Sequence, residues 1–216
     1  MAPTRLVVLI SGSGSNLQAI IDACQSGYIN AEVAAVISNK ADAYGLTRAK
    51  HAGIATQVLD HKQFASREEY DVALGQLISD FTPDLVVLAG FMRILTPSLV
   101  QKFKGKMLNI HPSLLPKYQG LNTHQRAIDA NDAEHGVSVH FVTEELDGGP
   151  VVCQARVPIL PDDTAESLAK RVHMQEHKLY PLVVKWFSEQ RLKMEADYAV
   201  FDNKTLPLEG APYPEL

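Results

Sequence analysis

The sequence predicts an α/β protein with a doubly wound, mainly parallel open sheet and antiparallel strands toward the C-terminus. Through residue 111, short apolar runs rich in β-branched residues alternate with segments of helical periodicity. A glycine-rich loop separates the first apolar run from the first helical segment. After residue 116 two strand-like runs follow each other closely, too closely for a helical crossover. These observations favour βα units followed by an antiparallel pair.

The first unit is the most informative. Residues 5–10 (RLVVLI) form the continuous apolar run of a strand covered on both faces. Residues 11–16 (SGSGSN) then lead into a helix, an arrangement that offers backbone N–H groups to an anion. The loop is neither a full dinucleotide fingerprint, since Leu17 stands at the third glycine position, nor a P-loop. A phosphate or mononucleotide site fits better than NAD, and a tight turn with serine caps is the alternative.

The next units follow in order. Strands are expected at residues 33–37, 56–59, 85–89 and 107–111, and helices at residues 43–51, from Ser66, and from residues 96–97. Ser66 and Glu69 have the spacing of a capping box. The loop at residues 90–95 (GFMRIL) is unusually apolar for a connection, which is typical of a segment lining a ligand groove.

The strand at residues 107–111 (MLNIH) ends in two polar side chains. Because strand side chains alternate, Asn109 and His111 share a face, and Pro112 ends the ladder. The carboxyl end of a parallel strand is where open α/β sheets bind ligands. The same residues also fit a turn-forming asparagine and an ordinary strand-end histidine.

The second half of the sequence shows a different pattern of predicted elements. We expect a helix at residues 123–130, an antiparallel pair at residues 137–142 and 151–157, and a long helix capped by Thr164. Asp147 precedes two glycines in the loop between the paired strands, which is first of all a turn signal. The tail at residues 197–216 is rich in proline and polar residues, and we expect it to be irregular and surface-lying.

A possible metal motif lies in the long helix. His173, Glu176 and His177 match the H-x-x-E-H spelling of inverted zinc metallopeptidases. A third ligand is required downstream, and the short tail offers only scattered glutamates. The spacing therefore favours no metal.

Composition bounds the function. The chain has 216 residues, 46% hydrophobic and 21% charged, which suits one soluble α/β domain with a full core. A net charge of −5 without a basic block makes nucleic acid an unexpected partner. Cys24 and Cys153 lack metal-site spacing, so reduced thiols in a reducing compartment are expected. No signal or membrane segment is recognisable, and a cytoplasmic protein without membrane contact is predicted.

Five blocks together resemble the folate-dependent formyltransferases. They are residues 11–17 (SGSGSNL), 89–95 (AGFMRIL), 109–116 (NIHPSLLP), 140–142 (HFV) and 146–150 (LDGGP). The resemblance covers nearly the whole chain. It implies a single formyltransferase domain over residues 1–216 with a Rossmann-like fold: a nucleotide-binding half (1–105), a catalytic and folate-binding half (106–190) and a C-terminal tail (191–216). The opening loop and compact length point to the branch that formylates glycinamide ribonucleotide in de novo purine synthesis.

The resemblance implies transfer of the formyl group of 10-formyltetrahydrofolate, a co-substrate, to a primary amine. The carbonyl oxygen becomes an oxyanion, which Asn109 and His111 would stabilise. A free imidazole titrates near about 6.5, so Asp147 would be needed to keep His111 protonated. The protonated ring could then assist the departure of N10. No metal and no covalent nucleophile are required.

The binding residues are also carried over from the family. Gly14, Ser15 and Asn16, helped by Lys106, would hold the nucleotide phosphate, and Glu176 would accept hydrogen bonds from the ribose. The folate site would be lined by Arg67, Met92, Arg93, Ile94, Leu95 and Asn109, with Val142, Thr143 and Glu144 closing on the pterin. The resemblance leaves a monomer and a homodimer equally open.

Four alternative functions share parts of this pattern. Methionyl-tRNA formyltransferase carries an additional basic C-terminal domain, and formyltetrahydrofolate hydrolase an N-terminal regulatory domain, and we expect neither here. A sugar-amine formyltransferase is harder to exclude. A non-catalytic nucleotide-binding regulator is disfavoured because Asn109, His111 and Asp147 are all intact.

Overall fold

A computed structural model provides the structure of the protein and describes residues 1–214. The chain forms two compact units, Met1–Asn109 and Ile110–Leu216, each of which is described by itself. The boundary between the units falls within the strand Met107–His111.

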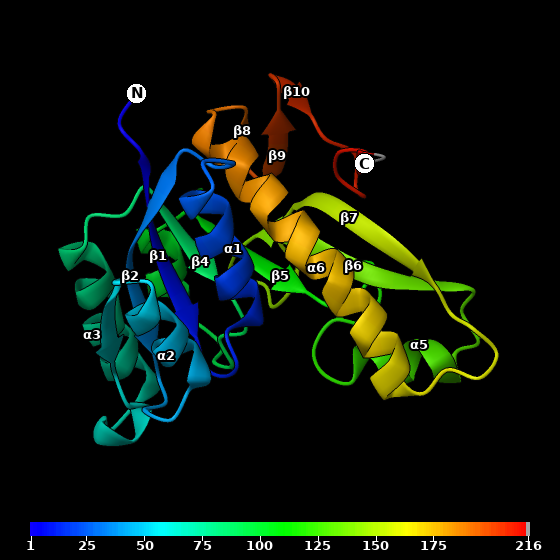
Figure 1. Ribbon diagram of the computed structural model, residues 1–216, viewed down its shortest axis with the longest axis horizontal. Coiled ribbons are helices and arrows are strands. Elements are labelled where there is room, and N and C mark those ends of the chain that lie inside the picture. Colours follow the sequence, from blue (N-terminus) through cyan, green and yellow to red (C-terminus); the bar gives the residue numbers. More distant parts are fainter. Residues whose placement is uncertain (215–216) are drawn as a thin grey trace. The chain divides into compact units, whose positions relative to one another are not determined.

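The first unit is a parallel βα assembly (Figure 1). Its strands are β1 (Thr4–Ile10), β2 (Ala31–Ser38), β3 (Ala55–Val58), β4 (Leu85–Leu88) and the first residues of β5 (Met107–His111). Every pairing among them is parallel. The chain builds outward from β1 through β2 to β3, then returns to the other side of β1 with β4 and β5. That reversal confirms the predicted doubly wound sheet.

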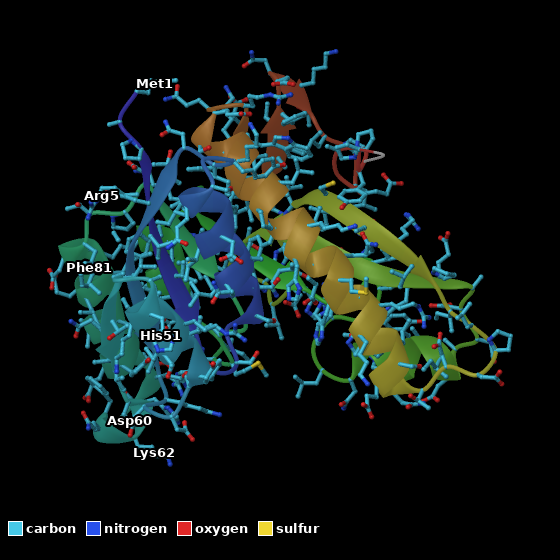
Figure 2. The ribbon with its side chains drawn as sticks, viewed as in Figure 1. Met1, Arg5, His51, Asp60, Lys62 and Phe81 are labelled. Carbon is cyan, nitrogen blue, oxygen red and sulfur yellow. The ribbon has the colours of Figure 1, made fainter. Side chains whose placement is uncertain are left out.

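The core of this unit lies along β1, where residues 6–10 are fully buried. Such burial explains why the strand reads as an unbroken apolar run. Arg5 lies near the start of β1 (Figure 2). It donates from Nη2 to the Phe81 carbonyl (2.9 Å) and from Nη1 to Glu32 Oε1 (2.6 Å), so its guanidinium is hydrogen-bonded on two sides.

Two of the four helices in the first unit begin at side-chain caps, Ser66 and Thr96. The helices are α1 (Ser15–Gln25), α2 (Tyr44–His51), α3 (Arg67–Asp80) and α4 (Pro97–Lys102), with a short 3₁₀ turn, η1 (His61–Gln63). Ser66 Oγ accepts from the Glu69 N–H (3.1 Å), which confirms the N-cap. The reciprocal bond differs from a capping box, because the Glu69 carboxylate accepts from the N–H of Ala65 (3.3 Å) rather than that of Ser66.

The second unit contains the antiparallel pair and the long helix. Strands β6 (Glu134–Phe141) and β7 (Val151–Pro158) are antiparallel, as predicted, and α5 (Thr123–Asp129) precedes them. Helix α6 (Ala165–Ser188) packs on both strands and begins with a capping box between Thr164 and Ser167. Its buried face includes Leu168, Val172 and Val183.

The prediction of an irregular tail at residues 197–216 is wrong for residues 198–205, and its last two positions, 215 and 216, lie outside the described residues. Strands β8 (Leu192–Glu195), β9 (Tyr198–Phe201) and β10 (Lys204–Thr205) form a small antiparallel sheet. The β9–β10 turn places Asp202 and Asn203 at positive φ, +48° and +63°, as a type I′ turn requires. The Trp186 ring packs 4.5 Å from that of Phe201. The polar composition of the segment concealed a two-residue hairpin turn of this kind.

Both cysteines are free thiols. Burial raises the pKa of Cys24 to about 11 and that of Cys153 to about 12, so both stay protonated at neutral pH. Within residues 1–214 no helix is long and apolar enough to cross a membrane.

Candidate active site

The glycine-rich loop joins β1 to α1 in the first unit. Gly14 has φ +72° and ends the loop as the N-cap of α1, a left-handed conformation that favours glycine. A Cβ at Gly14 would also lie only 2.6 Å from Gly45 Cα. Ser15 and Asn16 form the first turn of the helix, where N–H groups and the helix dipole favour an anion. The structure thus brings all three predicted phosphate residues together at one helix start.

The apolar loop after β4 is exposed as predicted for a ligand-lining segment. Met92 is 65% and Ile94 56% exposed, although both side chains are large and hydrophobic. Two hydrogen bonds connect the loop to the interior: the Met92 N–H donates to Ser11 Oγ (2.8 Å), and the Ser11 hydroxyl donates to Asn39 Oδ1 (2.6 Å). Both polar residues are buried. No motif in the sequence singles out Asn39.

Arg93 and Arg67 lie on different elements of the same unit. The Arg93 guanidinium stacks 4.7 Å from the centre of the Tyr70 ring, and the Tyr70 hydroxyl donates to the Leu59 carbonyl (3.0 Å). Burial raises the pKa of Tyr70 to about 12, so its ring stays neutral beneath the cation. Arg67 is the first residue of α3, and it is exposed.

Lys106 is not near the phosphate loop. Val86 pairs with Met107, and Leu85 with Leu6, so Lys106 lies level with the beginning of β1. The loop follows Ile10, four residues further along β1, which corresponds to ~13 Å at ~3.3 Å per residue. The ligand edge of the sheet is the opposite one. The structure therefore does not support the assignment of Lys106 to the phosphate.

The second unit contains a buried histidine–carboxylate pair. His111 Nδ1 lies 3.6 Å from Asp147 Oδ2, and the two side chains are 8% and 9% exposed. On the other side of the ring, His111 Nε2 lies 2.8 Å from the Tyr118 carbonyl oxygen. The Asp147 carboxylate also accepts from the Gly120 N–H (2.9 Å). The structure thus brings together the two residues that the sequence placed 36 positions apart.

Both ring nitrogens of His111 face oxygen atoms that only accept hydrogen bonds in this arrangement. The Tyr118 carbonyl cannot donate, so Nε2 carries a hydrogen. On the other side of the ring, Nδ1 lies 3.6 Å from Asp147 Oδ2, and a carboxylate oxygen also accepts rather than donates. The contribution of Tyr118 comes from its backbone, which no side-chain pattern could have indicated.

Asn109 lies two residues before His111 on β5 and is half-buried. Strand alternation directs both side chains to the same side of the strand. The strand ends at His111, before Pro112, as predicted. Asn109 thus remains a candidate amide donor beside His111.

The loop between β6 and β7 carries the remaining folate candidates. Val142 and Thr143 are half-buried, and Glu144 is exposed. Asp147 takes φ +50°, and a Cβ at Gly149 would lie 1.8 Å from the Phe141 carbonyl oxygen. The Asp-Gly-Gly segment is therefore a tight turn as well as the carrier of the carboxylate that faces His111.

Glu176 is buried in α6, with only 5% of its surface exposed. Its Oε2 lies 3.9 Å from His173 Nε2, at the outer limit of an ion pair. Across the described part of the chain, no three His, Cys, Asp or Glu side chains are arranged to hold a metal ion. A buried carboxylate on a helix is a suitable acceptor for hydroxyl groups of a ligand.

The chain matches the formyl transferase family over residues 4–184, most of its length. It belongs to this family, and it is an enzyme of the formyl-transferring class that uses 10-formyltetrahydrofolate as co-substrate. It is 57% identical to the phosphoribosylglycinamide formyltransferase of Haemophilus influenzae over 206 residues, 95% of this chain and 97% of that protein. It is 58% identical to the Escherichia coli protein of the same name, with the same coverage.

The chain is also similar to a solved structure. The phosphoribosylglycinamide formyltransferase of Coxiella burnetii, in complex with CHES, superposes with a TM-score of 0.94 at 52% sequence identity. The match covers 98% of this chain and 100% of that one. The resemblance read from the five sequence blocks is therefore confirmed.

Proposed function

We propose that the protein transfers the formyl group of 10-formyltetrahydrofolate to the amine of glycinamide ribonucleotide, a step of purine synthesis. The relatives of that name match over nearly their whole length. The observation that carries the chemistry is the buried His111–Asp147 pair, in which a carboxylate lies beside the ring of a histidine that can donate a hydrogen bond.

The reaction begins with attack of the amine nitrogen on the formyl carbon. The carbon–oxygen double bond opens to a tetrahedral oxyanion, to which Asn109 and the His111 cation donate hydrogen bonds. Donors of this kind are worth on the order of 3 kcal/mol each in the transition state. The oxyanion then re-forms the carbonyl, the bond from carbon to N10 breaks, and N10 takes a proton. The amine proton leaves to solvent, assisted by the Asp147 carboxylate.

The Tyr118 carbonyl matters for this mechanism, because it occupies the hydrogen on Nε2 of His111. A formyl oxygen can receive that hydrogen bond only by replacing the Tyr118 oxygen as acceptor. We propose that this exchange accompanies substrate binding. The carbonyl meanwhile keeps a buried N–H group satisfied in the unliganded protein.

The binding roles are divided between elements. The phosphate binds at Gly14, Ser15 and Asn16, where α1 begins. Glu176 accepts from the ribose hydroxyls. The folate contacts Arg67, Asn109, the exposed loop at residues 92–95, and residues 142–144.

We further propose one functional domain over residues 1–216, divided by role at residues 1–105, 106–190 and 191–216. The free thiols of Cys24 and Cys153 support a protein of the cytoplasm, and the acidic net charge of −5 supports one that binds neither nucleic acid nor a membrane surface. A monomer and a homodimer are both compatible with these roles.

The test is an assay of purified protein with 10-formyltetrahydrofolate and glycinamide ribonucleotide, followed by release of tetrahydrofolate. A formyltransferase of known activity serves as control. We expect formyl transfer to the ribonucleotide and none to a nucleotide-linked amino sugar. No transfer while the control is active would contradict the proposal, and transfer only to the amino sugar would establish the sugar-amine alternative.

A further inference from the structure

Helix α2 packs against the phosphate loop, residues 11–16, although none of the proposed binding roles involves this helix. The Gly45 N–H donates to the Gly12 carbonyl (3.1 Å). Arg48 Nε donates to the Ser13 carbonyl (2.7 Å). Two consecutive carbonyls of the loop are therefore directed toward a single helix.

The direction of these carbonyls fixes that of the N–H groups. In a planar trans peptide unit, the carbonyl of one residue and the N–H of the next point to opposite sides. Because the Gly12 and Ser13 carbonyls face α2, the N–H groups of Ser13 and Gly14 face away from it. They are thus presented on the side opposite α2, beside the start of α1, where the phosphate is proposed to bind.

The contact between helix and loop is direct. A Cβ at Gly45 would lie 2.4 Å from Ile10 Cδ1 and 3.2 Å from Gly14 Cα. Only a residue without a side chain permits α2 to come this close, so the loop rests on the helix backbone. The loop has little freedom to turn its peptide units on that side.

Arg48 is itself held in place. Its guanidinium lies 4.9 Å from the centre of the Tyr44 ring, one turn earlier on α2. A stacked arginine loses part of its rotamer freedom before the hydrogen bond forms, so its Nε is already oriented toward the loop.

We propose that Arg48 is a positioning residue for the phosphate loop: it holds the Ser13 carbonyl and thereby aims the Gly14 N–H at the phosphate of the substrate. The inference rests on the proposed function, since it requires the phosphate to bind at residues 14–16. Arg48 acts through the loop backbone, and its charge does not contact the phosphate.

Two substitutions separate the hydrogen bond from the charge. In Arg48→Gln the amide nitrogen occupies the place of Nε in the side chain, so a donor is kept while the charge is lost. In Arg48→Met the length is kept but both donor and charge are lost. Lys50→Met is the matched control, because Lys50 is exposed on the same helix.

Binding of glycinamide ribonucleotide and of its dephosphorylated ribonucleoside is measured by titration calorimetry. Arg48→Met is expected to weaken ribonucleotide binding about tenfold, the effect of one hydrogen bond of ~1.4 kcal/mol, and to leave the ribonucleoside Kd within about twofold. Arg48→Gln should stay within about threefold of the wild type for both ligands. Lys50→Met should change neither, and kcat at saturating substrate should hold throughout.

Each other result overturns the inference. Equal losses for ribonucleotide and ribonucleoside would show a merely structural role. A loss in Arg48→Gln as large as in Arg48→Met would show direct attraction by the charge, and unchanged binding in Arg48→Met would show no role. If the wild-type protein itself does not prefer the ribonucleotide, the phosphate site of the proposed function fails, and the role of Arg48 fails with it.

Discussion

Asp147 has two tasks at the scale of single residues, since it faces His111 and closes a tight turn. The two tasks can be separated by Asp147→Asn, because the amide oxygen can still accept from the Gly120 N–H while the negative charge is lost. We expect the formyl-transfer kcat to fall by a factor of about 100 or more, as is typical when acid catalysis is lost. The thermal unfolding temperature should change little.

Glu145→Gln is the matched control for this prediction, because Glu145 is an exposed carboxylate in the same loop. It should retain wild-type kcat. A near-wild-type kcat for Asp147→Asn would show that the carboxylate does not maintain the charge on His111.

Ser11 links the exposed folate loop to the buried Asn39 side chain. Ser11→Ala would leave the Met92 N–H and Asn39 Oδ1 without their shared partner, at a cost of about 1–3 kcal/mol in unfolding free energy. Because Met92 belongs to the folate loop, we expect KM for 10-formyltetrahydrofolate to rise several-fold, and more than KM for the ribonucleotide.

Steady-state kinetics with each substrate varied in turn measures this difference. Ser98→Ala, an exposed serine on α4, should leave both constants unchanged. Equal increases in both constants for Ser11→Ala would mean that Ser11 supports the whole site rather than the folate loop.

At the scale of elements, the approach of α2 to the phosphate loop depends on Gly45. Alanine favours a helix over glycine by ~1 kcal/mol, so propensity alone predicts that Gly45→Ala stabilises the protein. The new Cβ would lie 2.4 Å from Ile10 Cδ1, however, a distance that requires the loop or helix to move. Overpacking of this kind costs typically ~1–3 kcal/mol.

We therefore expect Gly45→Ala to lower the free energy of unfolding, measured by urea denaturation followed by circular dichroism. Lys50→Ala, on the exposed side of α2, should stay within about 0.5 kcal/mol of the wild type. A more stable Gly45→Ala protein would show that the loop yields easily and that α2 does not fix it.

At the scale of the whole molecule, buried neutral histidines make stability depend on pH. Burial, with a smaller contribution from the neighbouring His124, lowers the pKa of His135 to about 4, although Asp132 opposes the change. Burial also lowers the pKa of His140 to about 4. His124 Nδ1 lies 3.1 Å from His135 Nε2, a contact in which one nitrogen must accept. Protonation of both rings would break that bond.

The direction in which pH changes the free energy of unfolding follows from proton uptake by the two states. An unfolded histidine titrates near about 6.5, so between about pH 6.5 and pH 4 the unfolded chain binds more protons than the folded one. The stabilising contribution is complete above pH 6.5 and is lost as the pH falls toward 4. Each histidine accounts for on the order of 3 kcal/mol over this interval.

Urea denaturation between pH 7 and pH 4 measures this loss. His135→Gln should reduce the slope of stability against pH, whereas His51→Gln, at an exposed position on α2, should not. A slope unaffected by His135→Gln would place the acid sensitivity elsewhere.

The sequence alone determined most of the strands, helix starts and tight turns of this protein. The apolar runs specified the strands, Ser66 and Thr164 specified helix starts, and the glycines at residues 14, 148 and 149 specified tight turns. Such features depend on neighbours in sequence, so periodicity and turn chemistry reveal them. The pair of His111 and Asp147 was also predictable, but only because their types and spacing resemble a known family.

The tertiary structure alone decided what depends on distant backbone. The Tyr118 carbonyl at His111 and the Ser13 carbonyl at Arg48 leave no mark in the sequence, since every residue has a carbonyl and all except proline have an N–H group. The strand register likewise places Lys106 level with the beginning of β1, at the edge of the sheet opposite the phosphate loop. A sequence specifies which side chains are present, and packing decides which backbone atoms meet them.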